Sequence, residues 1–253
     1  MGEALLTGLL AAGWAEPGEL AVVEKIPARR TQLSEAHPGV TVADDLVSAA
    51  GAVVAVKPGD VESACRAIGK AGVDRVLSIA AGVRLRSLEE WIGASVPVVR
   101  AMPNTPALVG SGAAAIAAGT AAGDDDLAWA ETILSAVGTV VRVPEHLLDA
   151  VTGLSGSGPA YVFLVAEALI EAGVLVGLPR DVSTDLAVQT LVGSAQLLRD
   201  SGDTAEALRA AVTSPGGTTA AGLLALERRS VRAAFLEAVQ AATARSLQLG
   251  DPS

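Results

Sequence analysis

Short β-branched runs alternate with helical stretches over the first 145 or so residues, and this alternation constrains the fold more than any other feature. The runs expected to form strands are residues 20–23, 52–56, 75–79, 96–100 and 140–143. They are apolar on both faces and separated by helical segments. That pattern indicates a parallel sheet covered by helices.

From about Glu145 the pattern changes to helices only. Helices are expected over residues 160–176, from 181 or 183 to about 200, and over 204–212. After a break at two glycines, a further helix is expected to run to about 228 and a last one over 230–249. We therefore predict an α/β domain over residues 1–145 and an all-α domain over residues 146–253.

The predicted helix over residues 160–176 is apolar nearly all round. Such a helix is buried in its own domain or at a subunit interface. A domain of about a hundred residues is small for a fully buried central helix. We therefore expect an intertwined homodimer through the C-terminal helices, with a monomeric bundle core as the alternative.

Composition excludes several classes of function. The net charge is −10 and the 18 basic residues are scattered, which argues against nucleic acid as a partner. The chain has one cysteine (Cys65) and two histidines, too few of the usual ligands for a zinc site, so no metal is predicted. The single cysteine also predicts a reducing, cytoplasmic setting without an internal disulfide.

No membrane segment is expected. The most apolar stretch, residues 160–178, is interrupted by Glu167 and Glu171, and each carboxylate is costly at bilayer depth. The N-terminus lacks the charged, apolar and small-residue pattern of a signal peptide. The sequence thus predicts a soluble protein.

Residues 212–219 (Val-Thr-Ser-Pro-Gly-Gly-Thr-Thr) separate two apolar helical stretches. A helix cannot continue through Pro215 and two glycines, because proline lacks an N–H and glycine costs about 1 kcal/mol in a helix interior. Backbone N–H groups and hydroxyls at a helix N-terminus are what a small carboxylate requires. An ordinary helix–helix turn capped by threonine is the alternative interpretation.

The carboxyl ends of parallel strands are where ligands bind in an open sheet. The residues that follow the predicted strands are Glu24, Lys25, Lys57, Pro58, Ala80, Ala81, Gly82 and Asn104. Small residues at positions 80–82 would let a flat ring lie against the backbone, and Asn104 could hydrogen-bond an amide. Glu24 is well placed for a ribose diol, whereas Lys25, Arg29 or Arg30 could meet a 2′-phosphate. Together they suggest a dinucleotide, although each also has an ordinary explanation as a strand end or turn.

The chain resembles the pyrroline-5-carboxylate reductases, the enzymes of the last step of proline synthesis. The resemblance spans essentially the whole chain and rests on five segments in the family's order. These are residues 56–58, 78–82, 100–106, 154–161, and 212–219 followed by Leu226-Glu227.

The resemblance implies a Rossmann-like domain followed by a helical dimerisation domain, with dimers often assembled into a larger ring. The substrate, 1-pyrroline-5-carboxylate, would lie between the cofactor domain and the 214–219 turn, partly supplied by the partner subunit. Its carboxylate would be held by backbone N–H groups around Gly216, Gly217 and Thr218, with Ser214 nearby. Thr219 matches the hydroxyl that faces the ring nitrogen. The cofactor would be NADPH or NADH, and the basic cluster with the biosynthetic role favours NADPH.

The N-terminus departs from the family. Gly2 resembles the third glycine of a G-x-G-x-x-G motif whose first two glycines, and the strand before them, precede the position of Met1 in the family. Either Met1 is an internal methionine of a longer chain, or the chain lacks this strand and binds its cofactor poorly. An intact mass near 25.2 kDa for the native protein would exclude the first explanation.

Two alternatives to an active reductase stay open. One is a catalytically impaired homologue that keeps the helical dimer as a binding or regulatory protein. The other is a related reductase for another substrate. The 3-hydroxyacid dehydrogenases of similar layout need a lysine on the interdomain helix, and residues 160–176 contain none.

Overall fold

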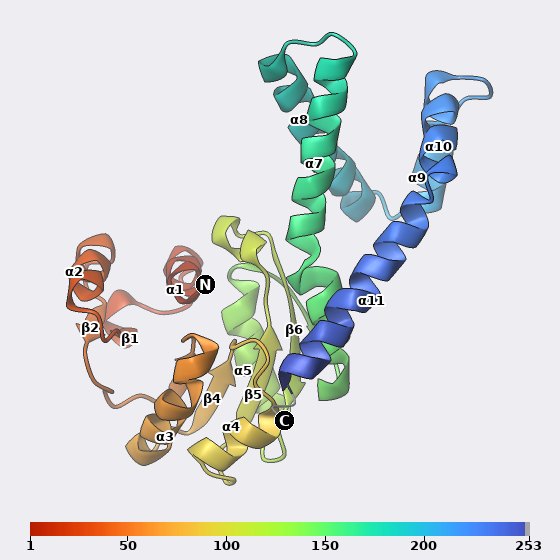
Figure 1. Ribbon diagram of the computed structural model, residues 1–253. Helices are drawn as coiled ribbons and strands as arrows, with labels where there is room; N and C mark the ends of the chain where they lie inside the picture. Colours follow the sequence, from red (N-terminus) through yellow and green to blue (C-terminus); the bar gives the residue numbers. More distant parts are fainter. Residues whose placement is uncertain (251–253) are drawn as a thin grey trace. The chain divides into compact units, whose positions relative to one another are not determined.

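A computed structural model describes residues 1–250 of the chain (Figure 1). The chain divides into two compact units. The first comprises Met1–Ser157 together with the chain from Ala241 onward, and the second comprises Gly158–Gln240. The first unit therefore extends beyond the region predicted as the α/β domain, since it also contains residues 146–157 and the end of the last helix.

The strands all lie in the first unit. They are β1 (Ala21–Val23), β2 (Thr41–Ala43), β3 (Gly51–Val54), β4 (Arg75–Ser78), β5 (Val98–Met102), β6 (Gly112–Ala118) and β7 (Gly138–Arg142). The five expected strands are confirmed with shifts of a few residues at their ends. β2 and β6 lie outside the predicted set.

One sheet contains β3 to β7 in chain order, and its pairs are parallel except for β5 with β6. The sheet is therefore parallel, as predicted, except at this one pair. β5 and β6 are joined through the short turn η3 (Thr105–Val109), which reverses the chain without a crossover helix. Such a direct connection between neighbouring strands gives antiparallel pairing.

β1 and β2 form a separate parallel pair. Within residues 1–250 no strand lies between β1 and β3, so each of them keeps one unpaired edge. Val23 on β1 and Val53 on β3 are correspondingly 37% and 38% exposed.

Helices cover both faces of the five-stranded sheet (Figure 1). The helices of this unit are α1 (Gly2–Ala11), α2 (Pro27–Ala36), α3 (Val61–Ala71), α4 (Leu85–Ile92), α5 (Asp124–Ser135) and α6 (Leu148–Val151). Because side chains alternate along a strand, Val76 packs with α3 and α4 whereas Leu77 packs with α1 and α5. Both valine and leucine are fully buried, so the strand residues form the centre of the core.

The end of α11 (Val231–Gly250) is fastened to the first unit by a buried hydrogen bond. Ser246 Oγ donates to Asp149 Oδ1 over 2.6 Å, and both residues are less than a tenth exposed. Nearby, the buried Arg100 donates to Glu145 Oε1 over 2.8 Å. The same oxygen accepts the Leu85 N–H, so one carboxylate joins three segments.

The second unit is entirely helical, as predicted. It contains α7 (Gly158–Leu175), α8 (Arg180–Asp200), α9 (Ala205–Ala211), α10 (Thr218–Arg228) and the start of α11. α7 and α8 pack closely where Gly173 meets Ser183. A Cβ on Gly173 would lie 2.0 Å from the Ser183 hydroxyl, which itself donates to the Ile170 carbonyl over 2.8 Å.

The second unit leaves most of its apolar side chains exposed. No residue of α7 is buried, and Phe163 and Leu164 are 63% and 65% exposed. The helical stretch Glu145–Leu175 contains an 18-residue window with a mean hydropathy of 1.5, so it is long and apolar enough to cross a membrane by length and composition alone. The single chain therefore does not form the monomeric bundle predicted as the alternative, because α7 is not buried in it.

Candidate active site

Three strand ends meet at one edge of the sheet. In the register of the sheet Val54 lies opposite Ser78, and Ser78 lies opposite Arg100. The segments that follow β3, β4 and β5 therefore leave the sheet side by side. They contain the predicted site residues Lys57, Pro58, Ala80, Ala81, Gly82 and Asn104.

The residues at this edge differ in accessibility. Lys57, Pro58 and Ala81 are exposed, whereas Ala80 is buried and Gly82 is half-buried. Gly82 has a φ of +76°, a conformation that side chains with a Cβ rarely adopt. Glycine here keeps the loop after β4 close to the sheet edge.

The N-terminus of α1 lies at the same edge. A Cβ on Gly2 would lie 3.0 Å from the Cβ of Ala55, which directly follows β3. The first helical hydrogen bond of α1 runs from Leu5 N to Met1 O, so the amides of residues 2–4 have no acceptor within the helix. Such an N-terminus favours a phosphate group.

Asn104 uses both ends of its carboxamide within the protein. Its Nδ2 donates to the Ser155 carbonyl over 3.0 Å, and its Oδ1 accepts the Ala113 N–H over 2.8 Å. The side chain therefore ties the loop after β5 to the start of β6 and to the short π-helix η5 (Thr152–Gly156). In this structure Asn104 positions the edge of the site, and its predicted bond to an amide of a ligand stays a prediction.

Glu24 directly follows β1 and is half-buried. Its Oε1 accepts the Ile26 N–H over 2.9 Å, which holds the carboxylate at the strand end. Arg30 donates to the carbonyls of Glu24 and Lys25 over 2.9 and 3.1 Å. The predicted group Glu24, Lys25, Arg29 and Arg30 is thus brought together at the end of β1.

Acidic residues that sequence reasoning missed surround this group. Arg29 pairs with Glu3 of α1, and Arg30 lies 3.8 Å from Asp44. Lys25 Nζ lies 3.9 Å from the Asp45 carboxylate. Asp44 and Asp45 follow β2, so recognising the short run 41–43 as a strand would have placed them at the same edge.

The 212–219 run forms a tight turn between α9 and α10. Gly217 N donates to Ser214 O over 3.0 Å, with Pro215 and Gly216 in the centre of the turn. Gly216 has a φ of +70°, as a type II turn with a central Pro-Gly requires. A Cβ on Gly217 would lie 2.4 Å from Ser214 Oγ, so the serine hydroxyl lies directly against this glycine.

α10 begins immediately after the turn, with Gly217 as its N-cap. The first helical hydrogen bond runs from Ala221 N to Gly217 O, so the amides of residues 218–220 have no acceptor within the helix. These amides and the helix dipole make an anion-binding end. Thr218 is exposed and Thr219 half-buried on the first turn of this helix.

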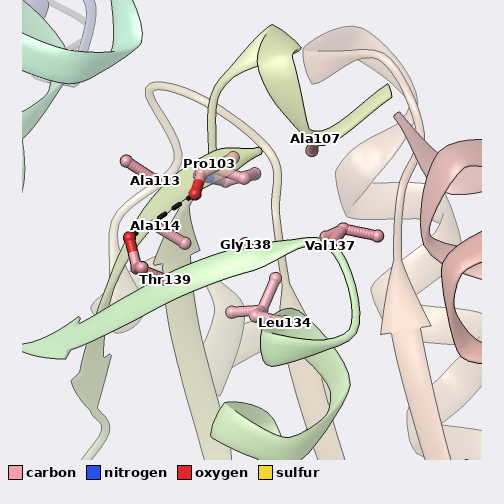
Figure 2. Close-up of a pocket in the computed structure, with 9 residues that line it drawn as sticks. Pro103, Ala107, Ala113, Ala114, Leu134, Val137, Gly138 and Thr139 are labelled. Carbon is pink, nitrogen blue, oxygen red and sulfur yellow. Dashed lines mark hydrogen bonds between the residues drawn. The ribbon is translucent and has the colours of Figure 1, made fainter. Parts of the chain in front are cut away.

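Two hollows described within residues 1–250 do not offer a ligand-sized space at the edge where β3, β4 and β5 end. One cavity, drawn in Figure 2, lies at the start of β6 and β7 and is lined by residues that include Pro103, Ala107 and Leu134. It has a volume of about 10 Å³. Its volume holds about one water. A hollow of about 330 Å³, lined by Ile116, Arg142 and others, lies at the carboxyl ends of β6 and β7. Because β6 is antiparallel to β5, that hollow lies at the opposite sheet edge.

Family models match both parts of the chain. A model described as pyrroline-5-carboxylate reductase dimerisation matches residues 145–249, and one described as NADP oxidoreductase, coenzyme F420-dependent, matches residues 1–82. The pyrroline-5-carboxylate reductase of Mycobacterium tuberculosis is 46% identical over 276 aligned positions, which cover 98% of this chain and 93% of that protein. The chain belongs to the pyrroline-5-carboxylate reductase family.

Solved structures of pyrroline-5-carboxylate reductases share the fold. The enzyme from Coxiella burnetii superposes with a TM-score of 0.94 at 34% identity, covering 99% of this chain and 95% of that one. The Plasmodium falciparum enzyme, solved with NADP bound, superposes with a TM-score of 0.83 at 31% identity and the same coverage. The Rossmann-like and helical parts expected from the resemblance are therefore confirmed.

Proposed function

We propose that this chain reduces the C=N bond of 1-pyrroline-5-carboxylate with NAD(P)H and forms L-proline. The observation that carries this proposal is the family membership over nearly the whole chain. The turn before α10 supports it, because it ends in the exposed amides and hydroxyls that a small cyclic carboxylate needs. Nothing in the comparisons supports a catalytically impaired binding protein.

The strand-end edge fits a dinucleotide. Gly2 allows the N-terminus of α1 to approach Ala55 closely, which favours a diphosphate at this place. Glu24 offers a fixed carboxylate to ribose hydroxyls, and the small residues 80–82 leave backbone accessible beside the sheet. When bound, the reduced nicotinamide supplies the hydride that the imine carbon receives.

The chain's own residues bind and orient the substrate. The amides of Gly216 and Thr218, on either side of Gly217, hold the carboxylate, while the Gly217 N–H closes the turn by donating to Ser214 O. The Ser214 hydroxyl lies beside them. The Thr219 hydroxyl makes a hydrogen bond at the ring nitrogen and orients the ring. A protonated imine is already electrophilic, so positioning by a hydroxyl suffices without a strong side-chain acid.

The activity is tested by mixing the purified protein with 1-pyrroline-5-carboxylate and each reduced cofactor. We expect reduced nicotinamide to be consumed and proline to appear in equal amounts. Reactions without the imine give the background rate. Absence of proline with both cofactors would contradict the proposed function.

A glycine substitution tests the turn as the carboxylate site. In Gly217→Ala the new Cβ would lie 2.4 Å from Ser214 Oγ, so the serine or the backbone must move. We expect KM for the imine to rise about tenfold, because a small displacement of binding groups costs affinity. Gly222→Ala is the control: its Cβ meets nothing within 4 Å, and alanine should stabilise α10 by about 0.5–1 kcal/mol. Equal KM values in both variants would exclude the turn as the carboxylate site.

The exposed apolar surface of α7 supports a homodimer through the C-terminal helices. Leu175 is 86% exposed, and Phe163 and Leu164 of the same helix are more than half exposed. Large apolar surfaces of this kind are covered by a partner, and a second copy is the partner that the family model for dimerisation favours. A ring of such dimers is a further expectation for the assembly.

The proposed setting is the cytoplasm. The relatives are pyrroline-5-carboxylate reductases, and the apolar stretch of α7 serves the dimer in this proposal. Cys65 is buried, and burial raises the pKa of its thiol to about 11. The thiol therefore stays protonated and unreactive at neutral pH, as suits a protein that does not depend on a disulfide.

A further inference from the structure

The charged side chains at the end of β1 differ in whether their hydrogen-bonding groups are already used within the protein or are still available to a cofactor. The group consists of the cations Lys25, Arg29 and Arg30 and the carboxylates Glu3, Glu24, Asp44 and Asp45. We name it the β1-end cluster. The cluster contains four carboxylates and three cations, so it carries an excess of negative charge.

The cations of the β1-end cluster are already engaged by the protein. Arg29 pairs with Glu3 and also donates to Gln32 Oε1 over 2.9 Å. Lys25 Nζ donates to the Asp44 carbonyl over 2.6 Å. A 2′-phosphate would have to compete with these protein acceptors for both cations, whose side chains are 38% exposed for Arg29 and 75% exposed for Lys25.

Arg30 is the least exposed of the three cations. Its side chain is 25% exposed, and its Nη1 donates to the carbonyls of Glu24 and Lys25. The guanidinium therefore braces the backbone of the strand end, and its other nitrogen faces Asp44 at 3.8 Å. Turning it toward a phosphate would leave those two carbonyls without this donor.

Glu24 remains as the group that meets the ribose. Its Oε1 accepts the Ile26 N–H, which fixes the carboxylate and still leaves acceptor sites on both oxygens. A fixed carboxylate accepts hydrogen bonds from two ribose hydroxyls. A 2′-phosphate would bring a second anion to the same place, where the charges repel each other.

We propose that the β1-end cluster makes NADH the preferred cofactor, because Glu24 binds a free 2′-hydroxyl while Glu3, Asp44, Asp45 and backbone carbonyls already hold the three cations. This inference rests on the proposed reductase function and specifies its cofactor. It reverses the preference for NADPH that the basic residues suggest when they are considered without their partners. Figure 1 shows α1, α2, β1 and β2, which supply or border these residues, within one region of the first unit.

The test measures binding of NADH and NADPH to the whole protein by calorimetry, without the imine. We expect the dissociation constant of NADH to be about tenfold lower than that of NADPH, the size of one hydrogen bond to a charged group. In Glu24→Ser the ratio should reverse, since the diol loses its acceptor and the phosphate loses its repulsion. In Glu3→Gln, which releases Arg29, NADPH should bind several-fold more tightly while NADH changes little.

Glu62→Gln is the matched control, because Glu62 pairs only locally with Arg66 on α3, an exposed pair one helical turn apart. It removes one carboxylate elsewhere and should leave the NADH to NADPH ratio unchanged. Tighter or equal binding of NADPH by the unmodified protein overturns the proposal. So does an unchanged ratio in Glu24→Ser, or absence of binding by either cofactor.

The proposal and the reductase function fail in different ways. Preferential binding of NADH without formation of proline would contradict the function and leave the cofactor preference standing. Formation of proline with NADPH favoured in both binding and turnover would contradict only the preference.

Discussion

Replacing Thr219 by valine is expected to lower kcat/KM for the imine by about 10- to 100-fold. The substitution keeps the shape of the side chain and removes the hydroxyl on the first turn of α10. A hydrogen bond to a charged group contributes about 1.5–3 kcal/mol, which corresponds to this loss of rate. The measurement is steady-state reduction of 1-pyrroline-5-carboxylate at saturating cofactor.

The folding of the Thr219→Val variant should be unaffected, because Thr219 is only half-buried. Thr184→Val on α8 is the control: it removes a hydroxyl that donates to its own helix, at the Arg180 carbonyl, away from the 212–219 turn. We expect the control to keep its turnover and both variants to keep their melting temperature. An unchanged rate in Thr219→Val would contradict the assignment of this hydroxyl to the ring nitrogen.

Replacing Leu164 by glutamate is expected to convert the proposed homodimer to monomers and abolish turnover. Leu164 is 65% exposed on α7 in the single chain, next to Phe163, which is 63% exposed. Burying a large apolar side chain contributes about 1.5–3 kcal/mol, and burying an unpaired charge costs several more. A loss of about 4 kcal/mol weakens association about 1,000-fold.

Light scattering after size-exclusion chromatography, over a range of protein concentrations, gives the mass of each species. Circular dichroism checks that the helices of the variant persist. Val141→Glu is the control, because Val141 is 56% exposed on β7 at the edge of the sheet in the first unit. If Leu164→Glu stays dimeric at low concentration, α7 is not the dimer interface.

Much of the architecture was predictable because local signals agree with the tertiary structure. The helices of the second unit begin and end close to the expected residues, since glycines and prolines interrupt an otherwise periodic apolar pattern. Thr204 caps α9 by accepting the Ala207 N–H, as a threonine before a helix predicts. The strand ends likewise lie at one edge, because parallel pairing aligns them.

β6 illustrates a part of the fold that local signals could not predict. Its residues, Gly112–Ala118, are mostly alanine, which has the highest helix propensity. They form a strand because β5 and β7 offer hydrogen-bonding edges on both sides, and Ala115 and Ile116 become fully buried between the helical layers. Burial and pairing with distant segments outweigh a preference of a few tenths of a kcal/mol per residue.

The sequence by itself determined the two-part organisation, the turn before α10 and the family, because these depend on periodicity and on residues that are neighbours in the chain. Only the tertiary structure decided which partners the charged residues after β1 have. From the sequence alone, the site after β1 is expected to suit either NADH or NADPH, because it contains both an acid and basic residues (Glu24, Lys25, Arg29 and Arg30). Glu3 and Asp44, which pair with the two arginines, come from other elements, and charge pairing between distant segments depends on the fold rather than on local pattern.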